Sequence, residues 1–120
     1  MTRDTKFPEI YFRFGLEDIE KGKKRETRRP YTDTNIYYFQ KLIGRIVKAV
    51  EGSKYTYILI VDVRKQRLSE VSDIDAHNEG FSSLKQFRNA WKSIYGSYNP
   101  EQLVVVIEFI PFACWRYDPS

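Results

Sequence analysis

Residue types that act together in hydrolysis lie close to one another near the start of the chain. Lys24, Thr27 and Arg29 form the pattern K-x-x-T-x-R, two positions after Gly22. A threonine hydroxyl is a potential nucleophile, and a lysine amine that has lost its proton can activate it. An arginine can bind a carbonyl oxygen or a phosphate. The threonine makes chemistry possible, whereas a basic cluster without the hydroxyl would indicate only anion binding.

The same segment concentrates positive charge, because residues 21–29 contain six lysines and arginines and one glutamate. Lys23, Arg25 and Arg28 are therefore candidates for contacts with phosphate groups, and Tyr31 is a ring that can stack on a base. The net charge of +4 agrees with an anionic partner such as RNA. A simpler alternative stays open, in which Lys24 and Arg29 only bind a phosphate and Thr27 is an ordinary strand residue.

The elements around the pattern decide which of its side chains can meet. We expect a strand at residues 10–14, a short helix at residues 16–21 that ends at Gly22, and an extended segment from residue 25 to Pro30. Thr27 and Arg29 share a face of an extended chain, whereas Lys24 has the opposite parity. Lys24 therefore joins them only if the chain turns between Gly22 and Arg25.

The rest of the chain of 120 residues predicts one domain that is mainly β with peripheral helices. A turn-rich loop is expected at residues 31–34 and a short helix at 35–42. Strands are expected at 43–50, 55–64 and 103–112, and a helix or helical turn at 68–76. A capping box formed by Ser83 and Gln86 begins the clearest helix, which Gly96 ends. Its apolar stripe consists of Leu84, Phe87, Trp91 and Ile94.

This order of parts resembles the ASCH family of the PUA-like superfamily over roughly residues 8–112, with 113–120 as a tail. The matching features are G-x-K-x-x-x-x-R at Gly22, Lys24 and Arg29, and the strand ending at residues 106–109. The resemblance implies a small β-barrel of about five to six strands, packed with helices around its open side. It also implies association with RNA and a cleft where the G-x-K segment meets the helices.

One branch of the family, the bacterial N4-acetylcytidine amidohydrolases, uses a lysine as proton acceptor, a threonine as nucleophile and a glutamate as proton donor. By resemblance these roles fall on Lys24, Thr27 and Glu79. The chain departs from that branch in having Arg25, Glu26 and Arg28, all charged, within the motif. We expect an amidohydrolase acting on a nucleoside or RNA. Two alternatives remain open: a non-catalytic RNA-binding module in the same cleft, and a ribonuclease-like activity with a different general base.

The composition argues against several other classes of protein. One cysteine excludes an intrachain disulfide and a cysteine-rich zinc site. With one histidine, a metal site would depend on carboxylates such as Asp73, Asp75 and Glu79, which we interpret instead as a charged helix face. We expect neither a metal nor a cofactor. The apolar runs have the length of strands, so we expect a cytoplasmic protein without membrane segments.

Overall fold

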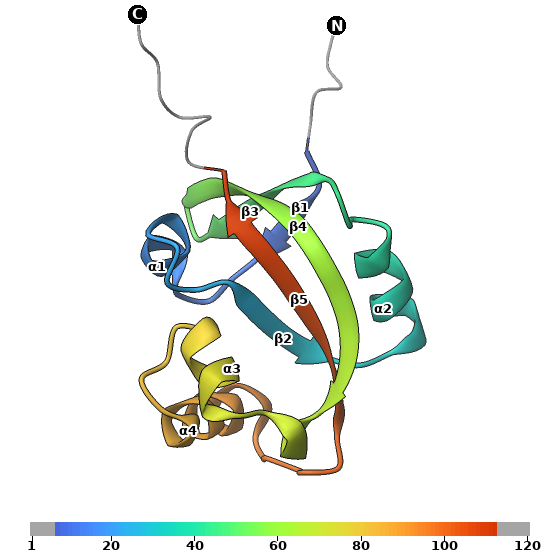
Figure 1. The fold of residues 1–120 in the computed structure, drawn as a ribbon, viewed down its shortest axis with the longest axis vertical. Helices are drawn as coiled ribbons and strands as arrows, with labels where there is room; N and C mark the ends of the chain where they lie inside the picture. The colour runs from blue at the N-terminus through green and yellow to red at the C-terminus, as the bar shows by residue number, and fades with distance from the viewer. Residues whose placement is uncertain (1–6, 113–120) are drawn as a thin grey trace, which may run out of the picture.

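A curved five-stranded mixed sheet carries the fold, and helices pack around it (Figure 1). The computed structural model describes residues 7–112, so the tail predicted at 113–120 lies outside this range. The strands are β1 (Glu9–Tyr11), β2 (Glu26–Pro30), β3 (Ile46–Glu51), β4 (Lys54–Arg67) and β5 (Leu103–Pro111), in the order β1-β3-β4-β5-β2. β1 and β3 are parallel, and the other neighbours are antiparallel. The prediction of a mainly β domain is confirmed.

The sheet does not close into the expected barrel. Its edge strands, β1 and β2, form no ladder with each other within residues 7–112. One side chain spans the opening instead: Arg29 Nη2 donates to the carbonyl oxygen of Tyr11 at 2.9 Å. The Arg29 guanidinium also lies 5.0 Å from the centre of the Phe12 ring. The barrel prediction is therefore not confirmed, and a side chain of the candidate site connects the two edges.

The helices are α1 (Leu16–Glu20), α2 (Asp33–Gln40), α3 (Asp73–Asn78) and α4 (Leu84–Tyr95), with a 3-10 turn η1 (Leu68–Glu70). α2 begins before the predicted residue 35 because the Thr32 hydroxyl accepts from Asn35 N and caps it at 2.9 Å. The helix predicted at residues 68–76 is divided, since Ser72 and Asp75 form a capping box that starts α3. No helix in the described part of the chain is long and apolar enough to cross a membrane.

α4 begins and ends where its sequence predicts. Ser83 Oγ accepts from Gln86 N at 3.2 Å, and Gly96 ends the helix with φ of +90°. The reciprocal bond of the predicted capping box differs, because Gln86 Oε1 accepts from Ser82 N at 3.1 Å and not from Ser83. Phe87 and Trp91 of the apolar stripe are buried.

β5 separates two hydrophobic clusters by alternating its side chains. Val105, Ile107 and Phe109 belong to the larger cluster, whereas Val104 and Val106 pack with the residues of α3 and α4. β2 pairs with β5 so that Thr27 lies opposite Ile107 and Arg28 lies opposite Val106. Consecutive residues of β2 therefore face opposite sides of the sheet. Figure 1 shows α3 and α4 together at one end of the molecule, beside β2.

Candidate active site

The chain turns after α1 as the motif requires. Gly22 has φ of +77°, a conformation that glycine adopts without steric cost. The amides of Lys23 and Lys24 then both donate to Asp18 O, at 2.8 and 3.1 Å. Arg25 N donates to Asn78 O at 2.6 Å, which fastens the start of β2 to the end of α3. This turn places Lys24 beside Glu79.

A cavity of about 420 Å³ lies where β1, β2, α3 and α4 meet. Thr27, Arg28 and Arg29 line it from β2, and Lys24 and Glu79 line it from the loops beside α1 and α3. The rest of its wall is mainly aromatic and includes Phe12, Phe14, Phe81, Phe87, Trp91 and Tyr95. The structure therefore brings together the four residues that the sequence assigned to nucleophile, base, acid and anchor.

Lys24 is buried, with 3% of its surface exposed. Its Nζ donates to the Glu79 backbone oxygen at 2.8 Å and lies 3.5 Å from Glu79 Oε1. Three rings surround the amine, with centres 5.5–6.0 Å from Nζ: those of Phe12, Phe14 and Phe81. Burial lowers the pKa of Lys24 and the charge of Arg29 acts in the same direction, while Glu79 opposes both. The neutral amine that a general base requires is therefore favoured by burial.

Two glycines that the sequence analysis did not single out make room for the Lys24 side chain. A Cβ on Gly15 would lie 2.9 Å from Cδ of Lys24, and one on Gly80 would lie 3.6 Å from its Cβ. Both glycines have positive φ, +97° and +94°. Their positions beside the first strand and beside Glu79 were the only signal available in the sequence.

The Thr27 hydroxyl is bonded to Arg29. Arg29 Nε donates to Thr27 Oγ1 at 3.3 Å, as expected for two residues on one face of a strand. Lys24 Nζ contacts Glu79 and not Oγ1, so the lysine and the threonine share the cavity without a direct hydrogen bond within residues 7–112. Burial lowers the pKa of Arg29, yet an arginine stays charged at neutral pH.

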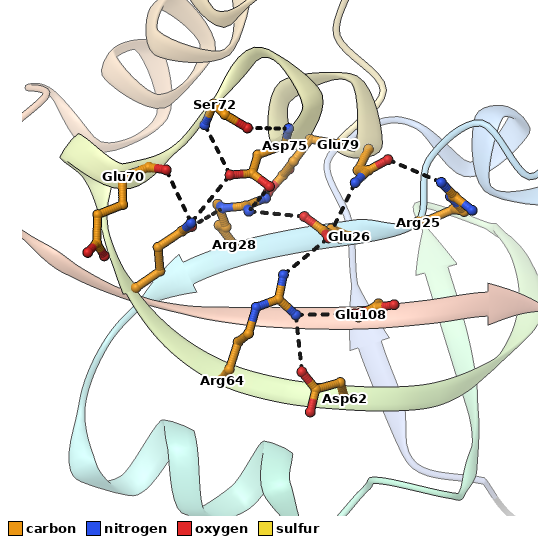
Figure 2. Close-up of polar contacts among 12 residues, drawn as sticks. Arg25, Glu26, Arg28, Asp62, Arg64, Glu70, Ser72, Asp75, Glu79 and Glu108 are labelled. Carbon is orange, nitrogen blue, oxygen red and sulfur yellow. Dashed lines mark hydrogen bonds and ion pairs between the residues drawn. The ribbon is translucent and has the colours of Figure 1, made fainter.

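Glu79 follows α3 and has both carboxylate oxygens engaged. Oε1 faces Lys24, and Oε2 accepts from Arg28 Nη1 at 3.1 Å. The Arg28 side chain is completely buried, with its Nη2 3.0 Å from Glu26 Oε1 (Figure 2). Arg28 also lines the cavity, but its guanidinium is paired with carboxylates, and its contact with a phosphate stays a prediction.

The remaining predicted binding residues do not line the cavity. Lys23 and Arg25 are exposed, and Arg25 Nη2 donates to Asn78 Oδ1 at 3.4 Å. The Tyr31 hydroxyl donates to Asp33 Oδ1 at 2.8 Å, and Lys65 Nζ lies 5.3 Å from the centre of its ring. These contacts place Tyr31 beside the start of α2 and not at the site.

The carboxylates near the site are engaged in other contacts. Asp73 Oδ1 accepts from Leu84 N at 3.2 Å, and Asp75 Oδ1 lies 3.5 Å from Arg28 Nη2. Burial raises the pKa of Asp75, but hydrogen bonds from Ser72 and the charge of Arg28 outweigh it, so the net effect lowers the pKa. Within residues 7–112 no three histidine, cysteine, aspartate or glutamate side chains form a group that could hold a metal ion.

No protein-family model and no curated protein sequence matches the chain. Solved structures do match. An ASCH domain from Lactobacillus crispatus superposes with a TM-score of 0.66 at 22% identity, over 89% of this chain and 80% of the other. The chain has an ASCH-type fold. Two further matches support this fold. A DUF984 protein from Enterococcus faecalis superposes with a TM-score of 0.60 at 19% identity, over 90% of this chain and 78% of the other. A protein from Pyrococcus furiosus superposes with a TM-score of 0.54 at 18% identity, over 88% of this chain and 96% of the other. In this ASCH-type fold, the cavity lies where the G-x-K segment meets α3 and α4.

Proposed function

We propose that the cavity is the active site of an amidohydrolase that removes the acyl group from an acylated nucleobase amine, with N4-acetylcytidine as the representative substrate. The observation that carries this proposal is the buried contact between Lys24 and Glu79. These residues are 55 positions apart in the chain, yet they lie together in the cavity that Thr27 also lines. A base, a nucleophile and an acid are the three groups that amide hydrolysis requires.

Thr27 supplies the nucleophilic oxygen. Its hydroxyl accepts a hydrogen bond from Arg29 Nε, so its own proton remains available for transfer to a base. The guanidinium beside Oγ1 stabilises negative charge that develops on this oxygen, because the buried site screens charges less than water does. Arg29 therefore assists the nucleophile in addition to its predicted role as an anchor for a carbonyl or phosphate group.

Lys24 and Glu79 share the proton that the reaction needs. The pair has the same net charge whether the proton is on the amine or on the carboxylate, and burial of Lys24 favours the neutral amine. Neutral Lys24 accepts the proton of Thr27 as Oγ1 attacks the acyl carbon. Protonated Glu79 gives its proton to the departing N4 amine as the C–N bond breaks. Water then cleaves the acyl ester of Thr27, releasing acetate and restoring the hydroxyl.

The walls of the cavity suit a planar base. Phe12, Phe14, Phe81 and Tyr95 all line it, and aromatic rings stack on nucleobases. A volume of about 420 Å³ lies within the usual range of about 300–1,000 Å³ for small-molecule pockets. Arg13, Lys24, Thr27, Arg28, Arg29 and Glu79 line the same cavity, so polar contacts can orient a base that the rings bind by stacking.

A second candidate is a non-catalytic RNA-binding module that uses the same cavity. The observation that favours it is the exposed Arg13, which lines the cavity and can contact a phosphate of a strand that continues out of it. Lys23 and Arg25 are also exposed. In this candidate the aromatic walls bind one unstacked base without cleaving any bond.

The decisive experiment follows the conversion of N4-acetylcytidine to cytidine by chromatography. Thr27→Val removes the hydroxyl and keeps the side-chain shape, whereas Thr27→Ser keeps a hydroxyl and serves as the matched control. We expect turnover in the parent and in Thr27→Ser but not in Thr27→Val, with all three folded by circular dichroism. A folded parent that releases no cytidine refutes the amidohydrolase and leaves the RNA-binding module.

A further inference from the structure

Arg28 is the one residue of the basic segment whose side chain is completely buried. Each nitrogen of its guanidinium has a different partner. Nε donates to Gln66 Oε1 at 2.9 Å, Nη1 donates to Glu79 Oε2 at 3.1 Å, and Nη2 pairs with Glu26 Oε1 at 3.0 Å. The planar group is therefore fixed from three directions.

This arrangement makes the two oxygens of Glu79 different. Oε2 accepts a hydrogen bond from Arg28, and a guanidinium donates hydrogens but accepts none. A proton on Oε2 would point at the N–H of Arg28, which is also a donor, so this oxygen is a poor place for the proton. Oε1 faces Lys24 Nζ at 3.5 Å, so a proton on this oxygen meets an amine that can accept it.

We infer that Arg28 is a positioning residue that holds Oε2 of Glu79, so that Oε1 is the oxygen that exchanges the proton with Lys24 and delivers it to the leaving amine. This inference rests on the proposed amidohydrolase function. It accounts for two of the three charged residues with which this chain departs from the branch it resembles, because Glu26 and Arg28 then belong to the support of Glu79.

Further ion pairs continue from Glu26 (Figure 2). Glu26 Oε2 accepts from Arg64 Nη2 at 3.3 Å, and Arg64 Nη1 lies 3.1 Å from both Asp62 Oδ2 and Glu108 Oε1. Lys24, Glu79, Arg28, Glu26 and Arg64 thus form an unbroken series of alternating charges. Arg28 itself is held directly by Glu79, Glu26 and Gln66, whereas Arg64 reaches it only through Glu26.

Arg28 also lines the cavity, but all three nitrogens of its guanidinium are already engaged by Gln66, Glu79 and Glu26, so its function is exerted through Glu79. Loss of a positioning residue lowers kcat while leaving KM nearly unchanged. Loss of a residue that binds the substrate raises KM. This difference separates the inference from the original prediction that Arg28 contacts a phosphate.

The test measures kcat and KM for N4-acetylcytidine in the parent, Arg28→Met, Arg28→Lys and Arg64→Met. Arg64 is the matched control, because it pairs with Glu26 but does not contact Glu79 or line the cavity. We expect Arg28→Met to lower kcat about 10- to 100-fold, since small displacements of a reacting group have effects of this size. KM should change less than about twofold, and Arg64→Met should keep kcat within about threefold of the parent.

The possible results are separable. A parent without turnover overturns the proposed function and this inference with it. An active parent with an unchanged kcat in Arg28→Met, or with an equal loss in Arg64→Met, overturns the inference alone. If Arg28→Met does not fold, Arg28→Lys decides, because it keeps the charge but cannot reach three partners at once. For Arg28→Lys we expect a lower kcat at an unchanged KM. A kcat of Arg28→Lys within about twofold of the parent overturns the inference.

Discussion

Replacing Gly15 with alanine tests the position of the Lys24 side chain without altering a charged or polar group. Gly15 has φ of +97°, and a Cβ there would lie 2.9 Å from Cδ and 3.3 Å from Cε of Lys24. A side chain at positive φ costs about 1–2 kcal/mol. Overpacking against the buried lysine adds about 1–3 kcal/mol, so we expect the free energy of unfolding to fall by about 2–5 kcal/mol.

Gly44→Ala is the matched control, because Gly44 has φ of +84° and a Cβ there would meet no atom within 4 Å. The free energy of unfolding of Gly44→Ala should fall only by the cost of a side chain at positive φ, about 1–2 kcal/mol. At about 4 °C per kcal/mol for a domain of this size, Gly44→Ala should lower Tm by about 4–8 °C and Gly15→Ala by about 8–20 °C.

Turnover of N4-acetylcytidine should separate the two variants more sharply than stability does. Displacement of Lys24 from Glu79 should lower kcat about 10- to 100-fold in Gly15→Ala, whereas Gly44→Ala should match the parent. The assay combines thermal unfolding with steady-state kinetics below the transition of both variants. Equal Tm and equal kcat in the two variants would show that Lys24 does not pack against Gly15.

Three further outcomes are expected. Burial lowers the pKa of Lys24 below its ordinary 10.5, so the unfolded chain binds the proton of the Lys24 amine more tightly than the folded chain does. The stability of the parent relative to Lys24→Met should therefore rise as the pH increases towards 10.5. Urea unfolding at pH 7 and 10 measures this, and a constant difference would contradict it. Phe87→Ala, on the buried face of α4, should lower the free energy of unfolding by about 3–5 kcal/mol in the same urea experiment, and a loss below about 1 kcal/mol would contradict the burial of Phe87. If the RNA-binding candidate holds, Arg25→Ala should reduce the salt slope of single-stranded RNA affinity by about 0.7, and an unchanged slope would exclude a phosphate contact there.

The features that the sequence predicted well depend on a few neighbouring residues. Gly22 and Gly96 end their helices in a left-handed conformation, and Ser83 caps α4. Thr27 and Arg29 meet because residues two apart share a face of a strand. The opposite parity of Lys24 was sufficient to show that it meets Thr27 and Arg29 only if the chain turns between Gly22 and Arg25. Each of these outcomes is decided within one turn of a helix or a few residues of a strand.

The features that the sequence did not predict depend on partners far away in the chain. Charged residues of a strand are usually exposed, and the burial of Arg28 results from Gln66, Asp75 and Glu79, which lie 38 to 51 positions later. The sheet also stays open between its edge strands β1 and β2 within residues 7–112, which the strand pattern did not indicate. The roles of Gly15 and Gly80 likewise become visible only when Lys24 is placed between them.

The most direct test of the central claim is to look for the acyl group on Thr27 itself. The parent is mixed with N4-acetylcytidine, quenched in acid within the first turnover, and digested for mass spectrometry. Catalysis by Lys24, Thr27 and Glu79 predicts one acetyl ester on Thr27, formed together with an equivalent of cytidine and absent from Thr27→Val. Cytidine released at an undiminished rate by Thr27→Val, with no acetyl group on Thr27 of the parent, would contradict it.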